Sequence, residues 1–202
     1  MKQLILVLCT IVLISAVSTA QQKQPTSKKG KKSVEKTIQP NGLVVIETSM
    51  GEISILLADD KAPKHAANFR KLAKEGFYAG TTFHRVIPGF MIQGGDPNSK
   101  DDDRSNDGLG GPNYNIDAEI GLLHERGVIA AARQGDQMNP ERKSNGSQFY
   151  ITVAAANFLD GQYSVFGKVT KGMEVVDKIV AVARDRNDNP IQKVDIKKVS
   201  IK

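Results

Sequence analysis

The 202-residue chain has almost no cysteine and no tryptophan. Its one cysteine, Cys9, lies in an apolar N-terminal run, so removal of that run would leave none. Residues 41–202 therefore offer no disulfide, no cysteine-based metal site and no thiol nucleophile. The three histidines, His65, His84 and His124, do not have the spacing of metal ligands. We therefore expect neither a metal nor a cofactor.

The composition also lacks the bias of a disordered, coiled-coil or polytopic membrane protein. Hydrophobic residues make up 40% of the chain and charged residues 25%, which is typical of a soluble globular protein. The length fits one domain of about 150 residues with some chain left over.

The positive charge is confined to one end of the chain. The 28 basic and 22 acidic residues give a formal net charge of +6, which on a folded surface would indicate an acidic partner such as nucleic acid. Residues 41–202, however, hold 21 basic and 21 acidic residues, whereas residues 21–40 hold six lysines against Glu35. Because no aromatic residue lies among these lysines, base stacking is not expected. We predict no nucleic-acid partner.

The first 20 residues have the pattern of a secretory signal peptide. A single lysine precedes an apolar run that ends at Val17, and the small residues Ser18 and Ala20 precede a plausible cleavage point. The apolar run is short for a membrane span, which needs about 20 apolar residues. We therefore predict an exported, periplasmic protein, with a membrane anchor made by an uncleaved N-terminal segment, or secretion, as alternatives.

This pattern divides the chain into three parts. Residues 1–20 are predicted to be the signal peptide, residues 21–40 a basic flexible linker and residues 41–202 the folded domain. The Lys-rich linker could also contact an anionic membrane surface.

Short β-branched runs separated by glycines predict a mainly β domain with two helices. The first helix would be capped by Asp59 or Asp60, with Pro63 in its first turn and Gly76 after its end. The second helix is predicted at Met173–Val182. The predicted strands are Leu43–Thr48, Glu52–Leu57, Thr82–Ile87, Phe90–Gln93, Val128–Ala132, Gln148–Val153, Ser164–Val169 and Val194–Ile201.

About eight strands and two helices fit a closed eight-stranded antiparallel β-barrel capped by two α-helices. Closure would remove the edge strands, and the helices would cover the barrel ends. The pattern leaves a β-sandwich with peripheral helices open as an alternative.

The most unusual segment is FHRVIPGFMIQGGD, residues 83–96. A Pro-Gly turn joins two strand-like runs, and if these pair, then Arg85, Met91 and Gln93 project from a common face. A lone arginine among apolar residues needs a reason, because its burial without a partner is costly. The alternative is an arginine stem that covers apolar surface and keeps its head in water.

This segment resembles the signature of the cyclophilin-type peptidyl-prolyl cis-trans isomerases. The resemblance continues through YNIDAE (114–119), RGVIAAAR (126–133), NGSQFYI (145–151), FLDG (158–161) and VFGKV (165–169), and covers about residues 42–202. It implies a cyclophilin-like barrel and a cofactor-independent enzyme that accelerates rotation about Xaa-Pro peptide bonds. Together with export, it implies assistance to the folding of exported proteins.

The resemblance also implies the site residues. Arg85 would donate to the prolyl nitrogen, and Gln93 would orient Arg85 or bind the substrate backbone. Some of the apolar positions could instead be plain barrel core. The remaining implied substrate-binding residues are Phe90, Met91, Ala132, Arg133, Gln148, Tyr150, Phe158, Leu159 and Tyr163.

Several positions depart from the family pattern. Phe158 stands where many members have a tryptophan that favours cyclosporin binding, so we predict weakened affinity for this inhibitor. Tyr150 replaces a phenylalanine, and its hydroxyl needs a partner. Tyr163 takes a position often held by histidine. Residues 134–143 are longer than in the commonest members and are predicted to form a polar loop beside the groove.

The predicted partners are proline-containing unfolded or flexible polypeptides, and the chain is expected to be a monomer. Two other functions are kept as alternatives: a non-catalytic module that binds prolyl peptides, and a surface- or nucleic-acid-binding protein acting through residues 21–40. Calcium binding by the acidic stretch 101–107 is not expected, since its residues lack the glycine-spaced pattern of a calcium loop.

Overall fold

The computed structural model describes residues 42–202; the predicted signal peptide and linker lie outside the described residues. The helices are α1 (Pro63–Lys74) and α2 (Met173–Val180), with short 3-10 helices η2 (Pro97–Lys100), η3 (Arg104–Asn106) and η4 (Asn157–Leu159). The strands are β1 (Leu43–Thr48), β2 (Gly51–Leu57), β3 (Arg85–Ile87), β4 (Met91–Gly94), β5 (Asn115–Ile116), β6 (Val128–Ala131), β7 (Ser144–Asn145), β8 (Phe149–Thr152), β9 (Val165–Lys171) and β10 (Ile196–Ile201).

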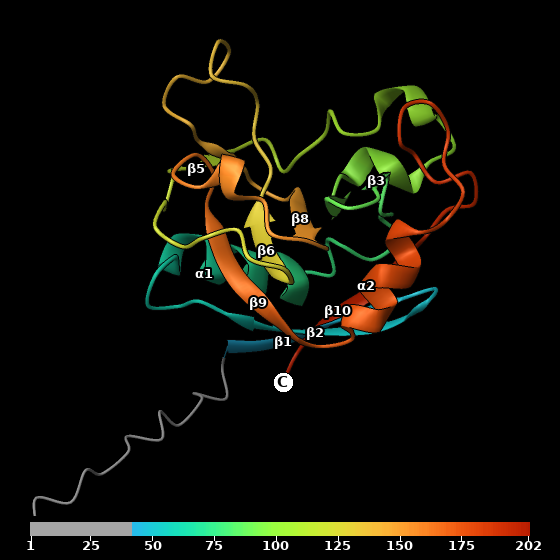
Figure 1. Ribbon diagram of the computed structural model, residues 1–202, viewed down its shortest axis with the longest axis horizontal. Helices are drawn as coiled ribbons and strands as arrows, with labels where there is room; N and C mark the ends of the chain where they lie inside the picture. The colour runs from blue at the N-terminus through green and yellow to red at the C-terminus, as the bar shows by residue number, and fades with distance from the viewer. Residues whose placement is uncertain (1–41) are drawn as a thin grey trace, which may run out of the picture. The chain divides into compact units, whose positions relative to one another are not determined.

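Eight of the strands form one curled antiparallel sheet in the order β10-β1-β2-β9-β6-β8-β4-β3 (Figure 1). The predicted hairpin of β1 and β2 is present, and Gly51 in its turn has a φ of 135°, where a side chain would be strained. The strands β5 and β7 form a separate two-stranded ladder that was not predicted.

The two ends of the sheet approach each other without forming a continuous ladder. The chain before β3 exchanges backbone hydrogen bonds with the start of β10: Phe83 donates to Val194 (2.9 Å), and Ile196 donates to Thr81 (2.7 Å). The strands β3 and β10 themselves do not pair. A mainly β fold with two helices and a curled eight-stranded antiparallel sheet is thus confirmed, while full closure into a barrel stays a prediction.

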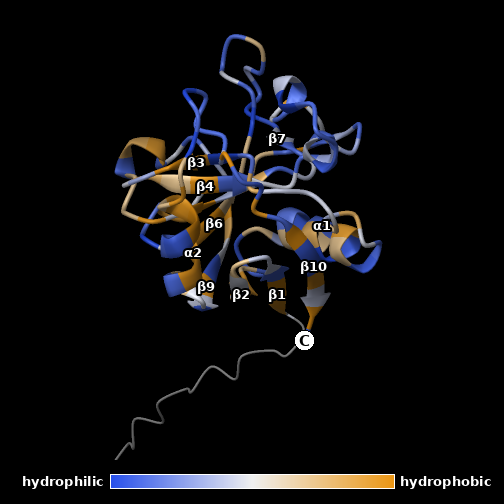
Figure 2. Cartoon of the chain, turned by 90° about the vertical axis from the view of Figure 1, so that its right-hand side faces the viewer, coloured by the Kyte–Doolittle hydropathy of each residue, from blue (hydrophilic) through white to orange (hydrophobic). Residues whose placement is uncertain are grey.

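The helices lie apart, α1 to the left and α2 to the right of the sheet in Figure 1, and α1 packs the predicted apolar face against the sheet. Ala66, Phe69, Leu72 and Ala73 are all buried in the main core, where Phe69 contacts Phe149 edge to face. The loops at the end of the sheet away from the C-terminus are mostly hydrophilic (Figure 2). Among residues 42–202, no helix is both long and apolar enough to cross a membrane.

The predicted cap of α1 by Asp59 or Asp60 is wrong. No side chain of the preceding turn caps this helix. The N–H groups of Lys64 and His65 in the first turn donate to the carboxylate of Glu119, both at 3.0 Å. Asp59 instead pairs with an arginine of α1. The acceptor is therefore supplied by a segment distant in sequence, which local cap patterns do not reveal.

Alternation along the central strands separates the core from a second apolar cluster. In β8, Phe149 and Ile151 point into the main core, whereas Tyr150 points to the other face. The second cluster on that face contains Met91, Val128, Ala130, Tyr150 and Val165, and it forms the base of the site described next.

Candidate active site

The β3–β4 ladder brings the predicted polar residues together. Arg85 lies opposite Gln93, and Ile87 lies opposite Met91, so Arg85, Met91 and Gln93 share one face as predicted. The Arg85 guanidinium is exposed, and its Nη1 lies 3.4 Å from Gln93 Oε1. The guanidinium is thus oriented by a weak contact and stays free to donate to a ligand.

A pocket of about 380 Å³ opens on this face, within the size range of small-ligand sites. Every predicted site residue except Gln148 lines it. The lining residues are Arg85, Phe90, Met91, Gln93, Ala132, Arg133, Tyr150, Phe158, Leu159 and Tyr163.

The pocket is apolar at its base and open at its rim. Met91 and Tyr150 are buried, with 2% and 5% of their surface exposed. Phe158 at the rim is 66% exposed, and its ring lies 5.4 Å from that of Phe90. Phe149, which follows Gln148 in the same motif, lies in the main core instead. A compact apolar ring that enters this pocket would therefore lose water on several sides.

The Tyr150 hydroxyl has the partner that its burial requires. It lies 2.9 Å from Nε2 of the fully buried His124, whose Nδ1 lies 2.9 Å from the Asp160 carboxylate. Because a carboxylate only accepts, Nδ1 holds the imidazole proton and Nε2 accepts from the hydroxyl. The backbone N–H and the ring of His124 lower the pKa of Asp160, while burial raises the pKa of Tyr150 and keeps it a neutral phenol.

Sequence reasoning predicted that this hydroxyl needs a partner but did not identify His124 or Asp160. The only signal was the tyrosine itself at a buried position. His124 lies 26 residues from Tyr150 along the chain, so no local motif connects the two residues.

Gln148 lies beside the pocket and connects it to a second, polar pocket of about 220 Å³. Its amide accepts from Gln93 Nε2 at 2.9 Å and donates to the carbonyls of Gly108 and Gly110 at 2.9 and 2.8 Å. The second pocket shares Gln93, Ala132 and Arg133 with the first. Residues 134–143 border it through Gln134, Asn139 and Lys143, so the predicted polar loop does lie beside the groove.

Arg133 contributes a buried side chain to the lining of the pocket. The guanidinium carbon lies 4.4 Å from the centre of the Tyr163 ring, and only 3% of the side chain is exposed. Its Nε donates to the Gln162 carbonyl at 3.0 Å. Tyr163 therefore stacks under a buried cation.

In the part of the chain that the structure describes, no three His, Cys, Asp or Glu side chains cluster in a way that could bind a metal ion. In the acidic stretch, Asp102 pairs with Lys193 at 2.8 Å and Asp103 caps η3. His84, next to Arg85, is buried, and desolvation lowers its pKa.

Comparison with known proteins identifies the family of this fold and pocket. The family model described as cyclophilin type peptidyl-prolyl cis-trans isomerase/CLD matches residues 43–201. The chain belongs to this family.

The cyclophilin relatives include the peptidyl-prolyl cis-trans isomerase-like 1 of Neurospora crassa, 39% identical over 159 residues, which are 78% of this chain and 93% of that protein. The peptidyl-prolyl cis-trans isomerase A of Dickeya dadantii is 45% identical over 163 residues, covering 78% and 80% of the two chains. A crystal structure of a cyclophilin-type isomerase from Cryptosporidium parvum has a TM-score of 0.72 at 34% identity, covering 80% of this chain and 97% of that one.

The same Cryptosporidium parvum enzyme was also crystallised in the presence of the dipeptide Ala-Pro, with a TM-score of 0.71 and 33% identity to this chain. Cyclophilins are isomerases of the peptide bond that precedes proline, and the chain is therefore a peptidyl-prolyl cis-trans isomerase. This family needs no cofactor. The reaction makes and breaks no bond; it crosses a rotational barrier of about 18–20 kcal/mol.

Proposed function

We propose that this cyclophilin accelerates Xaa-Pro rotation through Arg85. Twisting the peptide bond removes its resonance, so the prolyl nitrogen becomes pyramidal and gains a lone pair. A guanidinium can donate to that lone pair only after the twist, so it stabilises the transition state more than either ground state. Arginine stays protonated at any relevant pH. The position of Arg85 above an apolar pocket and beside Gln93 carries this proposal.

The pocket would hold the proline ring while the preceding residue rotates. Met91, Phe90, Tyr150 and Leu159 supply its apolar surface. Gln93, held by Gln148, presents its amide group beside it for the substrate backbone. The Ala-Pro dipeptide used with the Cryptosporidium parvum relative supports proline-containing peptides as substrates. We therefore propose unfolded or flexible proline-containing polypeptides as partners, bound by a monomer.

We propose further that the natural substrates are exported proteins during their folding, and that the enzyme acts in the periplasm. The support is the pattern of residues 1–20, a lysine followed by an apolar run and small residues. Contact with an anionic membrane surface would be confined to the lysines of residues 21–40, because residues 41–202 have balanced charge.

Fractionation of bacterial cells that produce the full chain tests export. We expect the protein in the periplasmic fraction with Gln21 as its N-terminal residue by mass spectrometry, and in the cytosol when residues 2–20 are deleted. Full-length protein in the membrane fraction would show an uncleaved anchor, and full-length protein in the cytosol would contradict export. The folding role is tested separately, by acceleration of a proline-limited refolding phase of an exported protein.

We also propose that cyclosporin binds this enzyme weakly. Phe158 lines the pocket at an exposed position and has no polar hydrogen, whereas the tryptophan of many family members at that place offers an indole N–H.

A further inference from the structure

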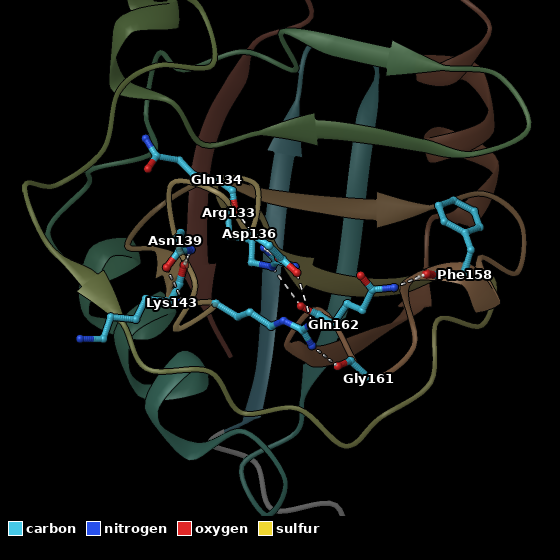
Figure 3. Close-up of polar contacts among 9 residues, drawn as sticks. Arg133, Gln134, Asp136, Asn139, Lys143, Phe158, Gly161 and Gln162 are labelled. Carbon is cyan, nitrogen blue, oxygen red and sulfur yellow. Dashed lines mark hydrogen bonds and ion pairs between the residues drawn. The ribbon is translucent and has the colours of Figure 1, made fainter.

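The carboxylate of Asp136 joins two arginines at the edge of the pocket. Its Oδ1 lies 2.6 Å from Nη1 of Arg133, and its Oδ2 lies 3.2 Å from Nη2 of Arg142. All three residues belong to, or directly precede, the loop of residues 134–143 that is longer than in the commonest cyclophilins. Figure 3 shows Arg133 and Asp136 beside Gln162.

Both arginines donate to the backbone of one neighbouring segment. Arg133 Nε donates to the Gln162 carbonyl at 3.0 Å, and Arg142 Nη1 donates to the Gly161 carbonyl at 3.2 Å. Gln162 in turn donates its amide to the Phe158 carbonyl at 2.8 Å (Figure 3). The segment 158–163, which we call the wall segment, is thus held by a chain of hydrogen bonds that starts at one carboxylate.

The wall segment forms one side of the proline pocket. It supplies Phe158, Leu159 and Tyr163 to the lining, and Arg133 lies over the Tyr163 ring. The Arg133 side chain is 3% exposed, and Asp136 is the acidic residue that pairs with it within residues 42–202. A buried guanidinium that loses its counter-charge is strongly unfavourable and is expected to leave its position.

We propose that Asp136 is a positioning residue for the proline pocket. It holds Arg133 and Arg142 in the places from which they fix the wall segment, although it does not line the pocket itself. The longer loop is then a support for the substrate-binding surface of this cyclophilin, and its effect on catalysis passes through the backbone of Gly161 and Gln162.

This role predicts a specific kinetic change. The wall segment contacts the proline ring in the ground state and in the transition state alike, so its displacement weakens both equally. Loss of such uniform binding raises KM and leaves kcat nearly unchanged. Loss of Arg85, in contrast, would lower kcat, because its contact forms only in the twisted state.

Asp136→Asn in the full chain tests the proposal, with Glu141→Gln as the matched control. Glu141 lies in the same loop and pairs with the partly exposed Lys143 rather than with either arginine. We expect Asp136→Asn to raise KM for an Xaa-Pro peptide about fivefold with kcat changed less than about twofold. Glu141→Gln should change neither value. An unchanged KM, or an equal effect of Glu141→Gln, would overturn the proposal.

This inference rests on the proposed proline pocket. A second variant and a spectroscopic measurement test the Asp136 bridge independently of that pocket. Arg142→Gln removes the other arm of the bridge without leaving a buried charge, since Asp136 is 50% exposed and keeps its pair with Arg133. We expect the carbonyl ¹³C resonances of Gly161 and Gln162 to move in Asp136→Asn, and that of Gly161 in Arg142→Gln. Resonances that stay in place would contradict the bridge, whereas moved resonances with an unchanged KM would contradict the role of the wall segment.

Discussion

Tyr150 shows how a single residue can change the base of a binding pocket without making it polar. Its ring lines the pocket, and its hydroxyl is bonded to His124 on the side away from the opening. The Asp160 carboxylate fixes the imidazole proton on the far nitrogen, so the near nitrogen accepts from the phenol. Because the His124–Asp160 pair binds the hydroxyl, a tyrosine can line this apolar pocket as a phenylalanine would.

Phe158 is the residue whose replacement should change inhibitor binding most. Phe158→Trp adds an indole N–H and a larger ring at an exposed position next to Phe90. We expect cyclosporin affinity to increase about tenfold, which is about 1.4 kcal/mol, with kcat/KM for a short peptide within about twofold of the wild type. A fluorescence or inhibition titration measures this. The prediction fails if the wild type already binds cyclosporin in the nanomolar range.

At the scale of elements, one buried carboxylate organises the long connection after β4. Asp96 is fully buried and accepts backbone N–H groups from Asn98 (2.8 Å), Gly108 and Gly110. The same loop offers the Gly108 and Gly110 carbonyls to Gln148 beside the pocket. The connection is thus folded around Asp96 and extends the active-site surface.

Asp96→Ala should therefore unfold this connection. Removal of the buried carboxylate leaves the N–H groups of Asn98, Gly108 and Gly110 without their acceptor, and we expect the free energy of unfolding to fall by about 2–4 kcal/mol in urea denaturation. Asp103→Ala is the control, because Asp103 is exposed and caps only the short η3 helix. A loss for Asp96→Ala no larger than that for Asp103→Ala would contradict this role.

Elements with a clear local pattern could be predicted from the sequence. The β-branched runs predict the observed bounds of β1 and place most other strands within a few residues. The ladder of β5 and β7 was missed because two-residue strands have no periodicity to detect. The cap of α1 was wrong because Glu119 reaches it from a distant segment.

The site residues, too, could be predicted where a local pattern exists and not where contacts between distant segments decide. The FHRVIPGFMIQGGD motif and the alternation of its strands predicted the shared face of Arg85, Met91 and Gln93. Asp136 and His124 were not predicted, because their roles depend on contacts with segments that only the fold brings near. Gly161 and Gln162, for instance, contribute backbone carbonyls that any residue type would offer.

At the scale of the whole molecule, buried histidines make stability depend on pH. Burial lowers the pKa of His65 and of His84 below the ordinary value of 6.5. The unfolded chain therefore binds protons at these residues at a higher pH than the folded chain does. Because stability rises with pH wherever the unfolded state binds more protons, acidification below about pH 6.5 favours unfolding.

We accordingly expect the free energy of unfolding to fall between pH 7 and pH 5. Urea denaturation at several pH values measures it, and His84→Phe, which has a similar shape but cannot titrate, should show a weaker dependence. The Glu119 carboxylate adds to the loss at lower pH: burial opposes its ionisation, but hydrogen bonds from His65 and two backbone N–H groups lower its pKa. An unfolding free energy that is flat from pH 7 to pH 5 would contradict the effect.

The proposed catalysis depends on the Arg85 guanidinium, and the activity of Arg85→Ala tests this role most directly. The measurement is kcat/KM for isomerisation of an Xaa-Pro peptide, with circular dichroism and Tm showing that the fold is kept. Loss of one donor that acts only in the transition state predicts a decrease of about 100-fold or more, mainly in kcat. An Arg85→Ala enzyme that retains activity within about twofold of the wild type would show that another group stabilises the twisted bond.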